Sequence, residues 1–285
     1  MTSVSDGQVI LLGGIAGATI FLGLPVGRTQ KLSSRTRALL NALAIGILLF
    51  LLWDVLSQAI EPVKKALTAA AVDGNGTWGR FAELAATFTL LLGVGLLSLV
   101  YYDRWLASRP RVRREGPGAA LAEDLRPAVS TLAHEASRLA LLIAIGIGFH
   151  NFSEGLAIGQ SAAKGEISLA LLLIIGFGMH NATEGFGIVA PMSTEGVRPS
   201  WKYHAALGLI GGGPTFLGTI VGESIVNDTL SVAFLALAAG SILYVILQLV
   251  KMAFRMGHRE VLMWGLLFGF LAGLATDFVL VAAGV

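Results

Sequence analysis

Long apolar stretches separated by short polar ones make up most of this chain. About eight of them have roughly the 20 residues that an α-helix needs to cross a hydrocarbon core about 30 Å thick. The predicted spans cover residues 8–26, 38–60, 81–102, 133–162, 166–190, 203–226, 229–253 and 260–284. The pattern therefore predicts an all-α polytopic membrane protein, with residues 1–285 forming a single transmembrane domain.

The composition agrees with a membrane protein and limits its chemistry. Hydrophobic residues make up 55% of the 285 residues, charged residues make up 13%, and the mean hydropathy is +0.76. A soluble domain has about 25% charged residues. Cysteine is absent, so a bound metal would have nitrogen and oxygen ligands rather than thiolates.

Basic residues gather in alternate loops. The fifteen on one side are Arg28, Lys31, Arg35, Arg37, Arg104, Arg109, Arg111, Arg113, Arg114, Arg126, Arg198, Lys202, Lys251, Arg255 and Arg259. The four on the other side are Lys64, Lys65, Arg80 and Lys164. The positive-inside rule places the larger group in the cytoplasm, and eight spans then place both termini outside.

Two polar segments are predicted to be loops. The segment of about 103–132 contains several prolines and an arginine run, and we expect it to be a flexible cytoplasmic loop. The arginine run favours a role in topology and in contact with anionic lipid over a specific role in binding nucleic acid or protein. Residues 61–79 are expected to form a shorter external loop, because Asp73-Gly74 is typical of a turn.

One polar pattern occurs twice inside the apolar spans. The copies read His150-Asn151-Phe-Ser-Glu154-Gly155 and His180-Asn181-Ala-Thr-Glu184-Gly185. Ionisable residues are costly within a bilayer and usually mark a functional site. In each copy the Glu follows the His by four residues, so the two side chains share one face of a helix.

The spacing of the two copies places them at the same depth. A turn near Gly165 lies 15 residues from each histidine, so both are expected at the same depth, near mid-membrane, in an antiparallel helix pair. Two His, two Asn and two Glu together are typical ligands for a divalent metal. A lone buried His is often a structural hydrogen-bonding group, and a lone Glu is sometimes a proton relay, but the repetition favours a metal site.

The doubled motif resembles that of the Zrt/Irt-like (ZIP) family of divalent metal transporters, in its bacterial form. In that family the fourth membrane helix carries His-Asn-x-x-Glu-Gly and the fifth a similar His-Asn-x-Pro-Glu-Gly. The resemblance implies a binuclear metal centre in a three-plus-two-plus-three helix arrangement whose outer triplets are inverted repeats. Carried over by position, one metal site would use His150, Glu154, His180 and Glu184. A second would use Asn151, Glu154, Asn181 and Glu184 with a carboxylate from the sixth helix.

The chain departs from the family pattern at three places. Thr183 replaces the proline of the second motif, which removes a kink. Gly213 stands before Pro214, where many members have a glutamate. The long loop is rich in arginine rather than histidine, with His134 as the sole nearby candidate. We therefore expect one well-formed metal site and a second that is weak or absent.

Other polar residues within the spans are less certain candidates. Asp54 and Asp277 are candidates for waypoints or proton acceptors, and Glu223 for attracting cations near the outer surface. The alternative for each is a hydrogen bond to a neighbouring helix or solvation near the membrane surface.

The expected function is uptake of a divalent metal into the cytoplasm by alternating access around the mid-membrane site. Zinc is the first choice, with iron, manganese, cobalt and cadmium as alternatives; the metal is the transported substrate, and no prosthetic group is expected. No enzymatic activity is expected. A membrane-embedded metal hydrolase is the runner-up, since it too would need His and Glu around an activated water.

The expected location is the inner (plasma) membrane, which the chain crosses several times. The expected partners are divalent metal ions and the lipid bilayer, without nucleic acid. A homodimer remains an open alternative to a monomer.

Overall fold

The computed structural model describes residues 6–28, 33–108, 127–165, 167–194, 198–225 and 227–282, and they are helical apart from short connections. Side chains of a few residues within these ranges, including His134 and His180, lie outside the description. The elements are α1 (Asp6–Ala18), α2 (Ile20–Gly23), the 3-10 helix η1 (Leu24–Arg28), α3 (Ser34–Ala71), α4 (Trp78–Ser108), α6 (Pro127–Ala163), α7 (Ile167–Thr194), α8 (Trp201–Ser224), α9 (Asp228–Arg255) and α10 (Arg259–Ala282).

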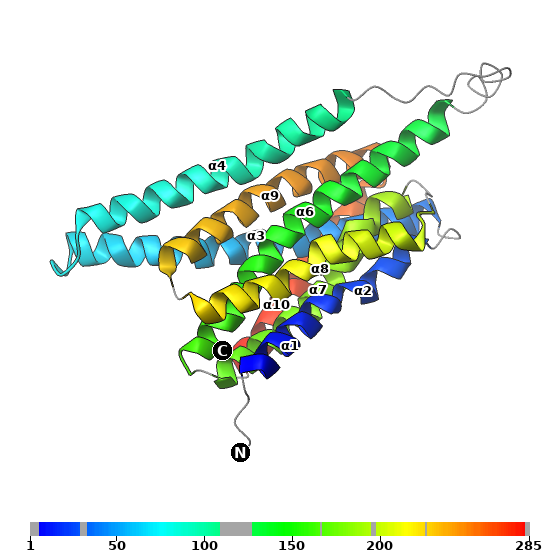
Figure 1. Cartoon of the computed structure of the whole chain (residues 1–285). Helices are drawn as coiled ribbons and strands as arrows, with labels where there is room; N and C mark the ends of the chain where they lie inside the picture. Colours follow the sequence, from blue (N-terminus) through cyan, green and yellow to red (C-terminus); the bar gives the residue numbers. More distant parts are fainter. Residues whose placement is uncertain are drawn as a thin grey trace.

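Eight helical segments of the described chain are long and apolar enough to cross a membrane. The prediction of an all-α protein with eight spans is therefore confirmed. The first span is built from α1, α2 and η1 in succession (Figure 1). Its helix is interrupted at Thr19, whose hydroxyl oxygen lies 2.7 Å from the carbonyl of Ala16 and 2.6 Å from that of Gly178 on α7, and whose single proton can be donated to either one.

The predicted external loop at 61–79 is wrong for most of its length. Helix α3 continues to Ala71, and α4 starts at Trp78, so the connection is a short turn in which Gly74 has a φ of +67°. The Ala, Leu and Lys residues of this stretch are good helix formers, and Glu61 pairs with Lys65 one turn later at 3.5 Å. The polar residues of this stretch therefore belong mostly to helices and not to a loop.

The loop predicted at about 103–132 is also narrower at both ends. Helix α4 continues to Ser108, and α6 starts at Pro127, where proline is well tolerated in the first helical turn. Residues 109–126 lie outside the described residues, so the rest of this prediction is not tested.

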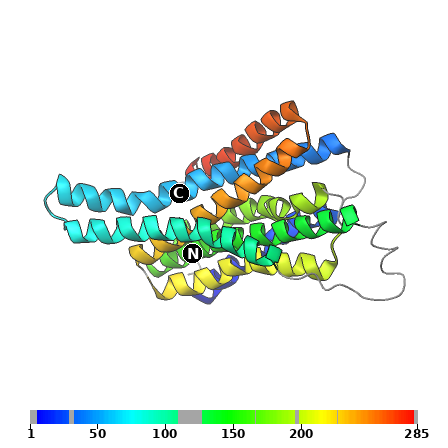
Figure 2. The same ribbon diagram turned by 90° about the horizontal axis from the view of Figure 1, so that it is seen from above.

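The long helices pack side by side in a bundle (Figures 1 and 2). Helix α4 lies at one edge against α9, and α3 lies along α10. Helices α1, α6, α7 and α8 contact one another and form a second group, which contains the two motifs. The turns α3–α4, α6–α7 and α8–α9 lie at the end of the bundle where α1 starts and α10 ends.

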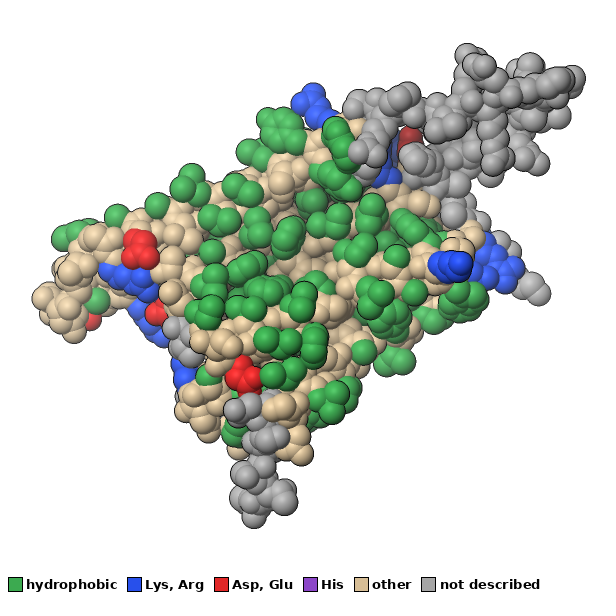
Figure 3. Space-filling view, in the orientation of Figure 1, with side chains coloured by type: hydrophobic (Ala, Val, Ile, Leu, Met, Phe, Trp, Pro, Cys, Tyr) green, Lys and Arg blue, Asp and Glu red, His purple; other side chains and the backbone are tan. Residues whose placement is uncertain are grey.

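The surface agrees with a protein surrounded by lipid. Figure 3 shows hydrophobic side chains over the middle of one face, with Lys, Arg, Asp and Glu gathered towards its ends. Exposed large apolar side chains include Leu90 on α4, Leu209 on α8 and Phe268 on α10, each more than half exposed. An apolar exterior of this kind costs little only where hydrocarbon replaces water.

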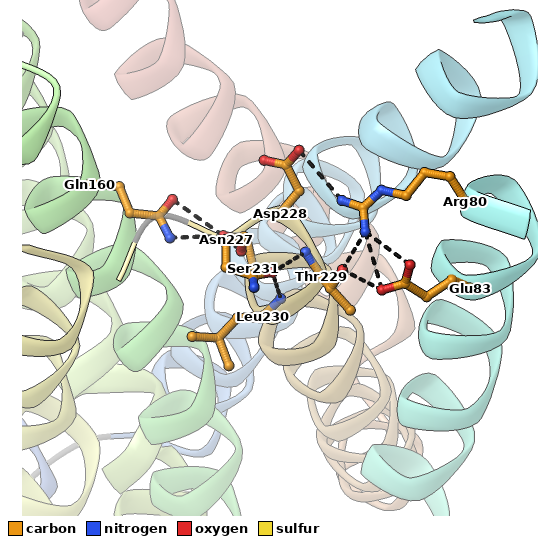
Figure 4. A network of polar contacts seen from close by, with 8 residues as sticks. All are labelled: Arg80, Glu83, Gln160, Asn227, Asp228, Thr229, Leu230 and Ser231. Atoms are coloured by element: carbon orange, nitrogen blue, oxygen red, sulfur yellow. Dashed lines mark hydrogen bonds and ion pairs between the residues drawn. The ribbon is translucent and has the colours of Figure 1, made fainter. Parts of the chain in front are cut away.

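A polar network fixes the helix ends near the α8–α9 turn (Figure 4). Arg80 on α4 donates to Glu83 at 3.1 Å and to Thr229 on α9 at 2.7 Å. Gln160 near the end of α6 donates to Ser231 on α9 at 3.2 Å. The network therefore links α4, α6 and α9 at this end of the bundle.

Candidate metal centre

Helices α6 and α7 carry the two motifs and meet as an antiparallel pair. The turn between them lies at Lys164–Gly165, where Gly165 has a φ of +78°, a conformation that favours glycine. His150, Asn151 and Glu154 on α6 are almost completely buried, as are Asn181 and Glu184 on α7. These five side chains therefore face the interior of the protein and not the lipid.

The imidazole of His150 joins the two helices. Its Nε2 lies 3.0 Å from Oε1 of Glu154, one turn further along α6. The same nitrogen lies 3.8 Å from Oε1 of Glu184 on α7. The structure thus brings one imidazole and two carboxylates together. Of these, His150 and Glu184 lie on different helices and are more than 30 residues apart in the chain.

The two motif asparagines are anchored in the same way. Nδ2 of Asn151 donates to the carbonyl of Gly211 on α8 at 2.9 Å, and Nδ2 of Asn181 donates to the carbonyl of Ala16 on α1 at 3.0 Å. Since a carbonyl can only accept, each carboxamide must present its nitrogen there. Each Oδ1 is therefore turned away from its anchor.

Several buried polar atoms of the cluster have no hydrogen-bond partner within the described residues. They are Nδ1 of His150, Oδ1 of Asn151 and of Asn181, Oε2 of Glu154, and both carboxylate oxygens of Glu184. Asn151 also lies beside Glu184, but without the geometry of a hydrogen bond. Buried polar groups are normally satisfied, and a buried unpaired carboxylate is especially costly. This set of oxygen atoms is suited to a cation.

The motif glycines let the helices approach closely enough for these bonds. A side chain at Gly155 would collide with the backbone of Thr215 on α8, and one at Gly185 would collide with the backbone of Ile20 on α2. Any larger residue would force the helices apart. The glycine after each glutamate therefore holds α6 against α8 and α7 against the first span.

The donor set fits a borderline or hard divalent cation, because it combines imidazole nitrogen with carboxylate and amide oxygen. The described His, Asp and Glu side chains do not form a ready-made group of three that could hold a metal. The side chain of His180, the remaining member of the predicted first site, lies outside the described residues.

The less certain candidates lie at different distances from the cluster. Asp54 on α3 is close enough to His150 to act on it electrostatically, and it accepts a hydrogen bond from Gln58 at 2.8 Å. Glu223 lies further along α8, where its backbone packs against Gly159 of α6. Asp277 is partly buried on α10, and no contact to the cluster is seen for it among the described residues.

Gly213 lies on the face of α8 that points away from the motifs. A side chain there would meet no atom within 4 Å. Leu217 and Ile220, one and two turns later on the same face, are exposed. A carboxylate at position 213 would therefore point outward from this helix in the present arrangement.

Sequence reasoning missed the backbone groups that anchor the site. The carbonyls of Ala16 and Gly211 hold the two asparagines, but a carbonyl leaves no trace in the choice of side chain. A faint signal exists in the small residues that surround them, Gly13, Gly17 and Gly212, which allow close helix contact.

A buried cluster of His, Asn and Glu inside a bundle of eight membrane-length helices is typical of membrane proteins that handle metal ions. A sequence model of the ZIP zinc transporter family matches residues 115–276. The chain therefore belongs to this family, whose members are transporters and not enzymes. It is a multi-pass membrane protein, and the runner-up hydrolase is set aside.

The chain is also similar to the zinc transporter ZupT of Lysinibacillus sphaericus (strain C3-41). The two are 28% identical over 166 residues, which is 55% of this chain and 55% of the relative. The matched region thus spans about half the length of that protein.

Proposed function

We propose that this protein carries a divalent metal, with zinc as the first candidate, across the inner membrane into the cytoplasm. The observation that supports this most strongly is the buried group of oxygen atoms on Asn151, Glu154, Asn181 and Glu184 that have no hydrogen-bond partner among the described residues, next to Nε2 of His150. Zinc is favoured by the family and by the relative. Iron, manganese, cobalt and cadmium remain alternatives, since the same donor atoms bind them.

In the proposed site the ion sits between α6 and α7, held by His150, Glu154 and Glu184 and by His180 across the pair. The two carboxylates offset the charge of a divalent ion, so the loaded site is close to neutral within the bilayer. The Oδ1 atoms of Asn151 and Asn181 are further donors, and Asp54 is a waypoint near His150. Because Gly213 faces outward, a second ion would lack the sixth-helix carboxylate, and we infer one strong site.

The helix pairing supports alternating access between inverted repeats. The pair formed by α3 and α10 has a counterpart in the pair formed by α4 and α9. Within each pair the two helices run parallel to each other. The contact of α6 with α8 through Asn151 and Gly155 likewise corresponds to that of α7 with the first span through Asn181 and Gly185. These correspondences favour the three-plus-two-plus-three arrangement, and the distribution of basic residues favours both termini outside.

Uptake of radioactive zinc into vesicles reconstituted with the protein tests this proposal. Glu154→Gln and Glu184→Gln keep the side-chain shape but remove the charge that offsets the ion. Each is expected to lower uptake at least about a hundredfold, since losing one partner of a buried charge interaction costs about 3–5 kcal/mol.

Glu83→Gln, which changes an exposed carboxylate on α4, is the matched control and should leave uptake within about twofold of the wild type. Equal uptake by all four proteins would exclude the assigned site. Absence of uptake by folded wild type for all the metals named would exclude transport. The extent to which iron, manganese, cobalt and cadmium each reduce the uptake of radioactive zinc ranks these metals as substrates.

A further inference from the structure

A cavity of about 190 Å³, lined by both apolar and polar side chains, lies between α4, α6 and α9, at the end of the bundle opposite the network of Figure 4. Its inner wall includes Ala136 and Leu142, which are each 1% exposed. At its mouth are Lys251 and Arg255, both exposed and both on the last turns of α9. The cavity thus joins an apolar interior to a basic rim.

The polar groups inside the cavity are already paired. Arg138 on α6 forms an ion pair with Asp103 on α4 at 2.9 Å, with both side chains about three-quarters buried. The phenol of Tyr244 on α9 is 5% exposed and interacts with Asp103 and with Gln248. This paired group connects three helices and holds the shape of the cavity.

The basic side chains at the mouth of the cavity, unlike Arg138, form no ion pair among the described residues. Lys251 and Arg255 are four residues apart, so they share one face of α9. Neither has a carboxylate within ion-pair distance among the described residues. Of the other charged groups that line the cavity, Asp103 and Arg138 neutralise each other, and Glu135 is a single negative charge. The cavity therefore has an excess of positive charge at its mouth.

We propose that this cavity binds a phosphate group, with Lys251 and Arg255 as its ligands. The group belongs either to the headgroup of an anionic lipid or to a soluble phosphate ester. The exposed apolar side chains of Leu247 and Phe254 lie about one turn to either side of Lys251, and they offer a surface to acyl chains beside the charged mouth. This neighbourhood favours a lipid, because clustered Lys and Arg next to a membrane surface attract anionic headgroups.

A bound phosphate would connect α9 to the helix that carries the first motif. Glu135 and Arg138 line the cavity near the start of α6, and His150 follows Arg138 by twelve residues, about 18 Å along the same helix. Binding here is expected to stabilise one position of α6 against α4 and α9. The proposal does not depend on which metal the protein carries.

The test is a count of bound lipids by native mass spectrometry of the purified full chain, titrated with phosphatidylglycerol or with phosphatidylcholine. The wild type is expected to bind one phosphatidylglycerol at least about tenfold more tightly than phosphatidylcholine. The double variant Lys251→Gln/Arg255→Gln should lose this preference, whereas Lys251→Arg, which keeps the charge, should retain it.

The matched control is Arg198→Gln/Lys202→Gln, which removes two exposed basic residues outside the cavity. It should keep the wild-type preference. An equal loss in this control, or equal binding of the two lipids by the wild type, would overturn the proposal. Competition with inorganic phosphate and glycerol 3-phosphate identifies the source: displacement of the lipid indicates a soluble phosphate, and its absence indicates the headgroup of an embedded lipid.

Discussion

Asn151 and Asn181 occupy equivalent positions in the two motif copies and make equivalent bonds. Each donates to a backbone carbonyl of a neighbouring helix and keeps a buried Oδ1 that has no hydrogen-bond partner in the described part of the chain. In the proposed site each residue therefore has two roles: its nitrogen anchors the helix that carries it, and its oxygen is a ligand for the ion. Groups that orient metal ligands matter nearly as much as the ligands.

Replacing either asparagine with alanine should weaken metal uptake without unfolding the protein. We expect Asn151→Ala and Asn181→Ala each to lower zinc uptake by about 10–100-fold, the usual range for groups that position ligands. Ser153→Ala is the control, because Ser153 is buried on α6 but bonds to its own helix at Phe149. Uptake by the asparagine variants equal to that of Ser153→Ala would contradict the role assigned to the carboxamides.

The motif residues could be predicted from the sequence because ionisable and amide side chains are conspicuous among apolar ones. Their surroundings could not be predicted. The carbonyl of Gly211 is recognised by Asn151 only after two helices have packed together. The outward direction of Gly213 likewise depends on how α8 is rotated about its axis in the bundle, and this rotation could not be predicted from the sequence.

At the scale of the helices, glycine decides how closely the motif helices approach their neighbours. Gly155 and Gly185 face backbone atoms of the helix packed against them, whereas Gly213 faces open space. The effect of adding a methyl group can therefore be compared between a tightly packed glycine and one that faces open space.

Gly185→Ala should destabilise the folded protein, because the added methyl group has no room beside Ile20. Overpacking of this kind costs about 1–3 kcal/mol. Gly213→Ala should leave stability unchanged or raise it by up to about 1 kcal/mol, since alanine favours a helix over glycine. Thermal unfolding in detergent measures both, and an equal effect of the two substitutions would contradict the close contact at Gly185.

Helix existence was predictable, but helix length was not. Apolar runs identify the eight spans, since their length is dictated by the bilayer. The bilayer does not dictate where a helix stops beyond it. Helix α3 continues through Pro62 to Ala71 because its polar residues also favour a helix, so a change from apolar to polar residues did not mark the end of the element.

At the scale of the whole molecule, the charge distribution predicts which end of the helix bundle faces the cytoplasm. The α3–α4 turn lies at one end of the bundle, and the α9–α10 turn with its basic residues lies at the other. Basic residues favour the cytoplasmic side, so the α3–α4 turn is expected to face outward.

Labelling of single cysteines tests this orientation, and the absence of native cysteine makes it direct. Asn75→Cys in the α3–α4 turn should react with a membrane-impermeant maleimide in intact cells. Glu260→Cys at the start of α10 should react only after the membrane is permeabilised. Both positions are exposed, so the reverse pattern would show that the protein has the opposite topology.

The central claim is that the transported ion binds between α6 and α7, at His150, Glu154 and Glu184. X-ray absorption at the zinc edge of the zinc-loaded protein tests it most directly. The account predicts nitrogen and oxygen ligands at about 2.0–2.2 Å with the outer scattering of imidazole, and loss of this spectrum in the double variant Glu154→Gln/Glu184→Gln. An unchanged zinc spectrum in that variant would contradict the account.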